Sequence, residues 1–116
     1  MQSRDTNTVL DREQLREVTM DDEALMREIL SALIDDTSRQ IQLLDQAIQE
    51  QNPQKCARLA HYSKGACANV GANRAAALLK QIELDAAASE FGECGASLGA
   101  LTREVDLLRA EVVNEP

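Results

Sequence analysis

The sequence predicts an all-α protein, an antiparallel up-down four-helix bundle with a short extra helix at its N-terminal end. The hydrophobic fraction of 44% comes almost wholly from aliphatic residues, with one Tyr, one Phe and no Trp. Five Gly and two Pro are fewer turn residues than a β-sandwich or barrel of 116 residues would need. Aliphatic residues also recur at helical spacing along most of the chain. A chain of this length provides one core, so we expect one domain.

The N-terminal half predicts a lead-in and two helices. We expect a flexible lead-in over residues 1–10 and the bundle over residues 11–113. A short amphipathic helix covers about residues 11–18. A long helix follows over about residues 21–51, because acidic residues at 21–23 favour a helix N-terminus. One stripe of this helix should be buried, and it consists of Leu25, Ile29, Leu33, Thr37, Ile41, Leu44 and Ile48.

The third helix begins at Asn52–Pro53, because Asn caps helix N-termini well and Pro is tolerated in the first turn. It continues to about Val70. We expect Asn69 and Gly71 to end it, and Asn73 to cap the helix that follows. Its inward face consists of Cys56, Leu59, Ala60, Ser63, Cys67 and Val70.

Two further helices complete the predicted bundle. One covers about residues 74–88, and the other follows a connection at residues 89–95, where glycines lower helix propensity. Short connections make consecutive helices antiparallel neighbours. The apolar residues are Ala77, Leu78, Ile82 and Leu84 in the first, and Leu98, Leu101, Val105, Leu108 and Val112 in the second.

Charge and composition exclude several classes of function. A formal net charge of -8 leaves no basic surface for a nucleic acid. No apolar run approaches the roughly 18 residues of a membrane span, and the polar start MQSRDTN is unlike a signal peptide, so we expect a cytoplasmic protein. Without a Gly-rich phosphate loop, we expect no ATP binding, no cofactor and no autonomous kinase activity. The apolar stripes can be satisfied within one bundle, so we expect a monomer.

The cysteines do not indicate a metal site. Cys56, Cys67 and Cys94 are an odd number, and their spacing matches neither CxxC pairs nor a zinc-ligand pattern. Only one histidine is available to join them. We therefore interpret the three cysteines as reduced, small core residues and expect no bound metal.

That histidine, His61, is the candidate functional residue. It lies opposite the apolar face of its helix, so we expect it to face solvent. Its neighbours within two turns are small or cationic, and they are Ala57, Arg58, Lys64, Gly65 and Ala68. A glycine inside a helix costs about 1 kcal/mol relative to alanine, so Gly65 indicates a surface from which side-chain bulk is excluded. Lys64 and Arg58 would flank a site suited to an anion.

These residue types fit a histidine that carries a phosphoryl group. An exposed imidazole is partly neutral at physiological pH, so a free ring nitrogen can attack phosphorus. A nearby lysine would offset the arriving charge, and phosphoryl transfer needs positioning and charge compensation more than covalent chemistry from the carrier. Periodicity alone leaves an alternative open, in which His61 is incidental, Lys64 and Arg58 are solvated, and Gly65 serves helix packing.

A longer pattern distinguishes these interpretations. The stretch LAHYSKGACANVGANRAAALLKQIE, from Leu59 to Glu83, resembles the histidine phosphotransfer (HPt) family, whose signature is an Ala-His-x-Leu-Lys-Gly run followed by a Gly-Ala step. His61 matches the phosphorylated histidine, Lys64 and Gly65 match the Lys-Gly pair, and Gly71–Ala72 matches the step. A looser resemblance covers about residues 21–112.

Two positions depart from the family pattern. Ser63 stands where the family usually has Leu, and Leu33 stands where an aromatic residue is common in the long helix. These changes affect local packing and leave the reactive positions intact.

The resemblance implies a phosphorelay intermediate. His61 would accept a phosphoryl group from the aspartyl phosphate of a response-regulator receiver domain and relay it to another receiver, with a hybrid sensor histidine kinase upstream. Receivers would supply the Asp, the Mg²⁺ and most of the catalysis. Lys64 would be the charge partner of the phosphate and Gly65 would give access, while partner binding would involve Ala57, Arg58 and Ala68.

Two other functions remain open at this level. The chain could be the phosphoacceptor domain excised from a larger chemotaxis-type histidine kinase. In that case the phosphoryl group would come from ATP, and a kinase core would transfer it. It could also be a helical interaction module without chemistry. The identity of the phosphoryl donor separates the first of these from a relay protein.

Overall fold

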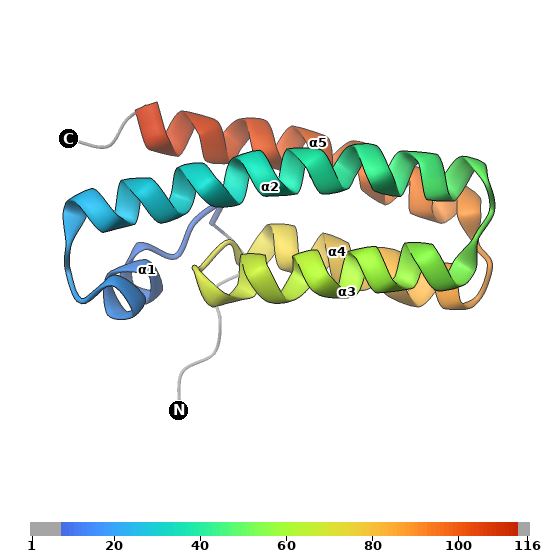
Figure 1. The fold of residues 1–116 in the computed structure, drawn as a ribbon, viewed down its shortest axis with the longest axis horizontal. Coiled ribbons are helices and arrows are strands. Elements are labelled where there is room, and N and C mark those ends of the chain that lie inside the picture. The colour runs from blue at the N-terminus through green and yellow to red at the C-terminus, as the bar shows by residue number, and fades with distance from the viewer. Residues whose placement is uncertain (1–7, 114–116) are drawn as a thin grey trace.

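The computed structural model describes residues 8–113 and contains five helices and no strand over this range (Figure 1). The four long helices form an antiparallel up-down bundle, so the predicted fold class is confirmed. The helices are α1 (Arg12–Thr19), α2 (Glu23–Gln49), α3 (Pro53–Asn69), α4 (Asn73–Ala87) and α5 (Phe91–Val113).

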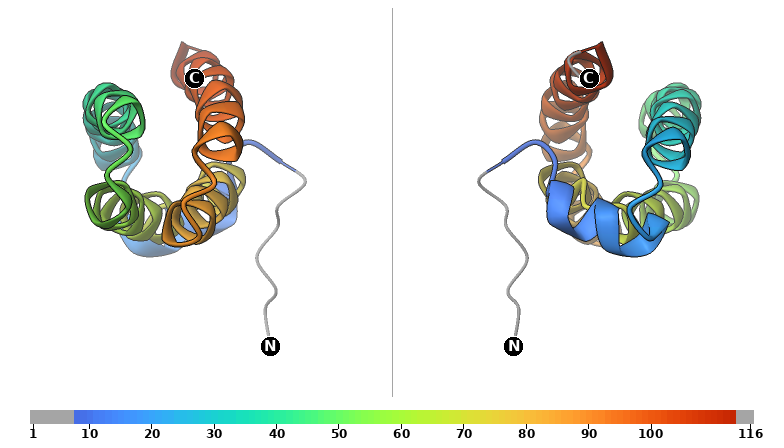
Figure 2. Two further views of the ribbon diagram at one scale, coloured as in Figure 1. Left: turned by 90° about the vertical axis from the view of Figure 1, so that its right-hand side faces the viewer. Right: turned by 90° about the vertical axis from the view of Figure 1, so that its left-hand side faces the viewer.

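The long helices are arranged as a square when the bundle is viewed along its axis (Figure 2). α2 packs against α3, α3 against α4, α4 against α5, and α5 closes the square against α2. The short helix α1 lies at the end of the bundle where α2 begins and α3 ends (Figure 1). Within the described part of the chain, no helix is both long and apolar enough to span a membrane.

Side-chain caps define three of the helix starts. Asp11 Oδ1 accepts a hydrogen bond from the backbone N–H of Gln14 at 3.1 Å, and Asp22 does the same for Leu25 at 3.0 Å. Asn52 Oδ1 accepts from the N–H of Lys55 at 3.1 Å, and Pro53 follows in the first turn, as predicted. Each cap satisfies a backbone donor that has no partner within its own helix.

Two predictions about helix ends are wrong. Asn73 does not cap α4, because it is a buried residue of the first turn whose Nδ2 donates to Gln14 Oε1 of α1 at 3.2 Å. The connection before α5 is only residues 88–90, so Gly92 and Gly95 lie inside the helix. Their low helix propensity is overcome because Cys94, Leu98 and Leu101 are anchored in the core.

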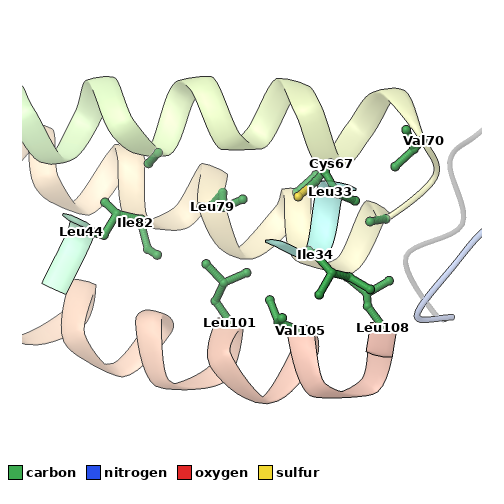
Figure 3. Packing of buried hydrophobic residues seen from close by; sticks show 14 of the residues in the cluster. Leu33, Ile34, Leu44, Cys67, Val70, Leu79, Ile82, Leu101, Val105 and Leu108 are labelled. Carbon is green, nitrogen blue, oxygen red and sulfur yellow. The ribbon is translucent and has the colours of Figure 1, made fainter. Parts of the chain in front are cut away.

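The core is formed by aliphatic side chains from all four long helices (Figure 3). The stripe predicted for the last helix is confirmed, and Leu101, Val105 and Leu108 are almost completely buried. In the stripe predicted for α2, Leu33, Thr37 and Leu44 are buried, and Ile29, Ile41 and Ile48 pack partly buried against the core. The stripe is wrong only at its start, where Leu25 is 36% exposed and Met26 and Leu30 are buried instead. In α4 the inward residues include Ala75, Leu79 and Ala86, whereas Ala77 is exposed and Leu84 is 56% exposed, contrary to the prediction.

The N-terminal segment contacts the connection between α3 and α4. Residues 1–7 of the predicted lead-in lie outside the described residues, and of the remainder Leu10 is buried. The N–H of Asp11 donates to the carbonyl of Gly71 at 2.9 Å. Gly71 has a φ of 92°, and a Cβ there would lie 2.6 Å from the Asp11 carbonyl oxygen. Only glycine therefore permits this close approach.

Candidate functional site

His61 lies near the middle of α3 and faces solvent, as predicted, with 69% of its side chain exposed. The opposite face of α3 sets this direction. Ala60, Ser63 and Cys67 are buried, and Leu59 is half-buried against the core. Because successive helical residues point about 100° apart, a buried residue at 60 and another at 63 leave residue 61 on the outside.

A carboxylate from the neighbouring helix contacts the imidazole. Glu83 of α4 places Oε2 at 3.1 Å from His61 Nδ1, and its Oε1 accepts a hydrogen bond from Lys64 Nζ at 2.9 Å. The Glu83 side chain is 28% exposed, so this bridge is partly shielded from water. One acidic residue thus joins the histidine and the lysine of the predicted site.

Glu83 sets the tautomer of the ring. The hydrogen bond from Lys64 is the main reason that the pKa of Glu83 is lowered, so the group is a carboxylate at neutral pH. A carboxylate can only accept, so Nδ1 of neutral His61 carries the hydrogen and Nε2 carries the lone pair. The nitrogen that is free to act as a nucleophile is therefore Nε2.

The lowered pKa gives a pH-dependent contribution to stability. Because the folded pKa of Glu83 lies below its ordinary value of 4.5, its contribution is present above that value and is lost as the pH falls through the folded pKa. We expect Glu83→Gln to lower the free energy of unfolding at pH 7, and the difference from wild type to vanish at strongly acid pH. Urea unfolding of both proteins across this range measures it. A difference that persists unchanged in acid would show that the carboxylate charge is not responsible.

Gly65 has open space at its surface position. A Cβ at this residue would meet no atom within 4 Å apart from its own helix and chain neighbours. Packing therefore does not require a glycine here, and the surface one turn after His61 is open. The lysine beside it, Lys64, is half-buried and paired with Glu83, so it is held near the imidazole rather than extended into solvent.

The three residues predicted to bind a partner occupy different environments. Arg58 is exposed one turn before His61. Ala57 is half-buried and packs against the core. Ala68 is also half-buried, and its carbonyl accepts a hydrogen bond from the Gln14 side chain of α1. The structure thus brings Arg58 and Ala57 beside the histidine and places Ala68 next to α1.

Sequence reasoning missed Glu83 and a second interhelical pair beside the site. Tyr62 is 55% exposed, and its hydroxyl donates to Asp36 Oδ2 of α2 at 3.1 Å, which raises the pKa of the phenol. Neither acid could be paired with its partner from spacing along one helix. Glu83 is the last residue of the stretch that resembles the HPt family, and that position is the one sequence feature that could have pointed to it as a site residue.

The cysteines take no part in this site. Cys56, Cys67 and Cys94 are buried and free, as predicted. Burial raises the pKa of the Cys67 and Cys94 thiols to about 11, so both are poor nucleophiles at neutral pH. Among the described residues, no group of His, Cys, Asp and Glu side chains is arranged to hold a metal ion.

The position that departs from the family pattern, Ser63, is 1% exposed. Its hydroxyl has no hydrogen-bond partner among the described residues. A buried hydroxyl without a partner costs free energy, so this departure weakens the core beneath His61 without altering the exposed face.

Comparison with known proteins agrees with the fold. The family model of the Hpt domain matches residues 28–111. Histidine-containing phosphotransfer protein B from Pseudomonas aeruginosa is similar in structure, with a TM-score of 0.83, 24% identity, and coverage of 91% of this chain and 92% of that chain. A rice protein described as a histidine-containing phosphotransfer protein has a TM-score of 0.81 and 21% identity, over 92% of this chain and 79% of that chain. No curated relative matches in sequence.

The chain belongs to the Hpt domain family, because the family model matches most of its length, including α3 and α4. The two solved structures share its fold. Its function is histidine phosphotransfer in a phosphorelay, a system that includes receiver domains and kinases. These findings favour neither the excised chemotaxis-type domain nor the helical module without chemistry.

Proposed function

We propose that His61 Nε2 accepts a phosphoryl group from the aspartyl phosphate of a receiver domain and passes it to the aspartate of a second receiver. The observation that carries this proposal is the exposed imidazole whose Nδ1 faces the Glu83 carboxylate. That contact leaves Nε2 as the free nucleophile, and the open surface at Gly65 gives a partner room to approach it.

The transfer step requires no proton to leave the protein. The Nε2 lone pair forms a bond to phosphorus as the bond between phosphorus and the aspartyl oxygen breaks, and the receiver carboxylate departs with that electron pair. The phosphorylated ring keeps its Nδ1 hydrogen, and Glu83 stabilises the positive charge that the ring gains. In the second transfer the ring leaves as neutral imidazole, and phosphorus bonds to the next aspartate.

Lys64 is the charge partner of the phosphoryl group in this proposal. Its Nζ is already beside the imidazole through Glu83, and a phosphoryl group on Nε2 would compete for it. We expect Lys64→Ala to remain a phosphoacceptor, with transfer slowed or the phosphohistidine lifetime shortened by up to about fivefold, because an ion pair between a lysine and a phosphoryl group at the protein surface contributes about 0–1 kcal/mol. Decay of purified phosphoprotein at low and high salt measures the effect. An unchanged lifetime at low salt would remove Lys64 from the site.

The partners that fit this step are response-regulator receiver domains and a hybrid sensor histidine kinase. The receivers would bring the aspartate and the Mg²⁺. We propose that the domain works as a monomer in the cytoplasm, where ATP-dependent kinases operate. Arg58 and Ala57 would contact the receiver directly, while Ala68 would support the adjoining surface through its contact with α1.

The test is incubation with phosphorylated receiver domains. Receivers loaded with acetyl phosphate are mixed with the protein, and the product is examined for phosphate that is stable to base and labile to acid, as expected for phosphohistidine. Transfer without ATP or a kinase core supports a relay intermediate. Phosphorylation that requires ATP and a kinase core would instead identify a kinase phosphoacceptor domain.

A further inference from the structure

A groove runs along the surface between α4 and α5, away from the phosphoacceptor. Its volume is about 710 Å³. Much of its lining is aliphatic, with Ala77 and Leu78 from α4 and Ala100 and Leu107 from α5. Leu107 is 44% exposed, so this apolar surface is open to solvent. Pockets that bind ligands have volumes of about 300–1,000 Å³, so the α4–α5 groove is large enough to hold one.

A buried carboxylate that lines the α4–α5 groove has one oxygen without a donor. Glu104 is 4% exposed, and its Oε1 lies 3.0 Å from an Arg74 guanidinium nitrogen. Its Oε2 has no hydrogen-bond partner among the described residues. A buried acceptor without a donor costs free energy, so native proteins rarely leave one. Arg103 and Leu107 beside it are exposed and can turn aside, so a molecule in the groove can supply the missing donor.

The charge of the groove differs in sign from that of the whole chain. The chain has a formal net charge of -8, but the charged residues that line the groove are two arginines and one acid. Arg74 is paired with Glu104. Arg103 is exposed, and it forms no ion pair with another residue in the described part of the chain. The surplus positive charge favours an acidic group in the ligand.

We propose that the α4–α5 groove binds a short, extended, acidic peptide segment of a partner protein. A backbone N–H of the segment would donate to Glu104 Oε2, and an acidic side chain would pair with Arg103. Aliphatic side chains would pack on the apolar lining. An extended segment is favoured over a helix, because a helix uses its backbone N–H groups internally. Arg74 and Gln81 span about 10 Å along α4, which about three or four extended residues cover.

A segment bound in this groove would leave the phosphoacceptor accessible. Figure 2 shows α2 and α3 along one side of the square and α4 and α5 along the opposite side. Glu83, the α4 residue that contacts His61, does not line the groove. The segment would therefore tether the protein to a partner while His61 stays free to react, which raises the effective concentration of that partner. This inference does not depend on the proposed function, and it is tested on unphosphorylated protein.

The experiment is an NMR titration of ¹⁵N-labelled protein with three synthetic peptides blocked at both ends. The first is Glu-Leu-Ala-Leu-Glu, which carries the proposed chemistry. The second is the same peptide with its central amides N-methylated, which removes the N–H donors and leaves the protein unaltered. The third is Lys-Leu-Ala-Leu-Lys, which reverses the charge. A chain with a net charge of -8 repels an acidic peptide in general, so binding of the first peptide reports a local site.

Five single variants of the protein are titrated with the first peptide. Glu104→Gln keeps the shape of the buried side chain and removes its charge. Arg103→Glu and Leu107→Ala change the rim of the groove. Arg39→Glu and Leu43→Ala are the matched controls on α2, where the arginine side chain is 61% exposed and the leucine is 37% exposed.

The first peptide should shift the amide signals of Ala77, Gln81 and Ala100 and leave that of His61 unchanged. A Kd of about 0.1–1 mM is expected for so short a ligand. N-methylation, and each of the three groove variants, should weaken binding about tenfold or more, because each removes a hydrogen bond, an ion pair or an apolar contact. The two controls on α2 should bind as wild type does. The lysine peptide should bind Arg103→Glu better than it binds wild type.

Several results would overturn the proposal. No shift of any signal at about 5 mM of the first peptide would do so, since a site of this kind would then be largely filled. Equal binding of the unmodified and N-methylated peptides would remove the donor to Glu104, and equal binding of the acidic and lysine peptides would remove the charge recognition. Wild-type self-association in sedimentation that Leu107→Ala abolishes would identify a second copy of the chain as the occupant. Shifts by free leucine at the same concentrations would identify a small-molecule site.

Discussion

His61→Gln is expected to abolish phosphorylation by receiver domains and to leave the fold intact. The variant loses Nε2, the atom that would bond to phosphorus, while its amide can still donate to Glu83. With 69% of the His61 side chain exposed, the free energy of unfolding should change by no more than about 0.5 kcal/mol. Transfer from phosphorylated receivers and urea unfolding of the same preparation measure both effects.

The wild-type protein and Lys64→Ala are the controls for this variant, since both should retain phosphoacceptance. A His61→Gln protein that is phosphorylated to the wild-type level would place the phosphoacceptor elsewhere. A variant that fails to unfold cooperatively would instead assign His61 a structural role, which its exposed position does not predict.

A bulky substitution at Gly65 should slow transfer from a receiver without lowering the stability of the bundle. A Gln at 65 replaces the least favourable helix residue apart from proline, so the helix should gain up to about 1 kcal/mol. Its side chain would rise one turn after His61 and lean back towards it, because helical side chains tilt towards the N-terminus. We expect Gly65→Gln to raise or preserve Tm and to slow receiver-dependent transfer at least about tenfold, which corresponds to about 1.4 kcal/mol in the barrier. Gly65→Ala should transfer at a rate between those of wild type and Gly65→Gln.

Gly95→Gln in α5 is the matched control for this substitution. A Cβ at Gly95, like one at Gly65, would meet no atom within 4 Å, and the residue also lies inside a helix. Both variants should therefore gain helix propensity, while only the change at 65 obstructs the imidazole. Transfer by Gly65→Gln at the wild-type rate would show that the receiver does not approach over this surface. Slow transfer by both would indicate a general effect on the bundle.

Local sequence patterns predicted much of the fold. Asn52–Pro53 marked a helix boundary because a capping side chain and a fixed φ act within one turn, and the structure has that cap. The apolar spacing of α5 also identified its buried face. The errors arose where packing overruled local preference. Gly92 and Gly95 are helical because neighbouring residues are held in the core, and Asn73 binds Gln14 of another helix instead of capping its own.

The sequence by itself determined the helical class, the outward direction of His61 and the small, cationic surface around it, because helical periodicity relates residues within a few turns. The tertiary structure alone decided which acids meet that surface. Glu83 reaches His61 and Lys64 from α4, and Asp36 reaches Tyr62 from α2. The register between packed helices depends on how all the core side chains interlock, so no spacing along one helix could predict these pairs.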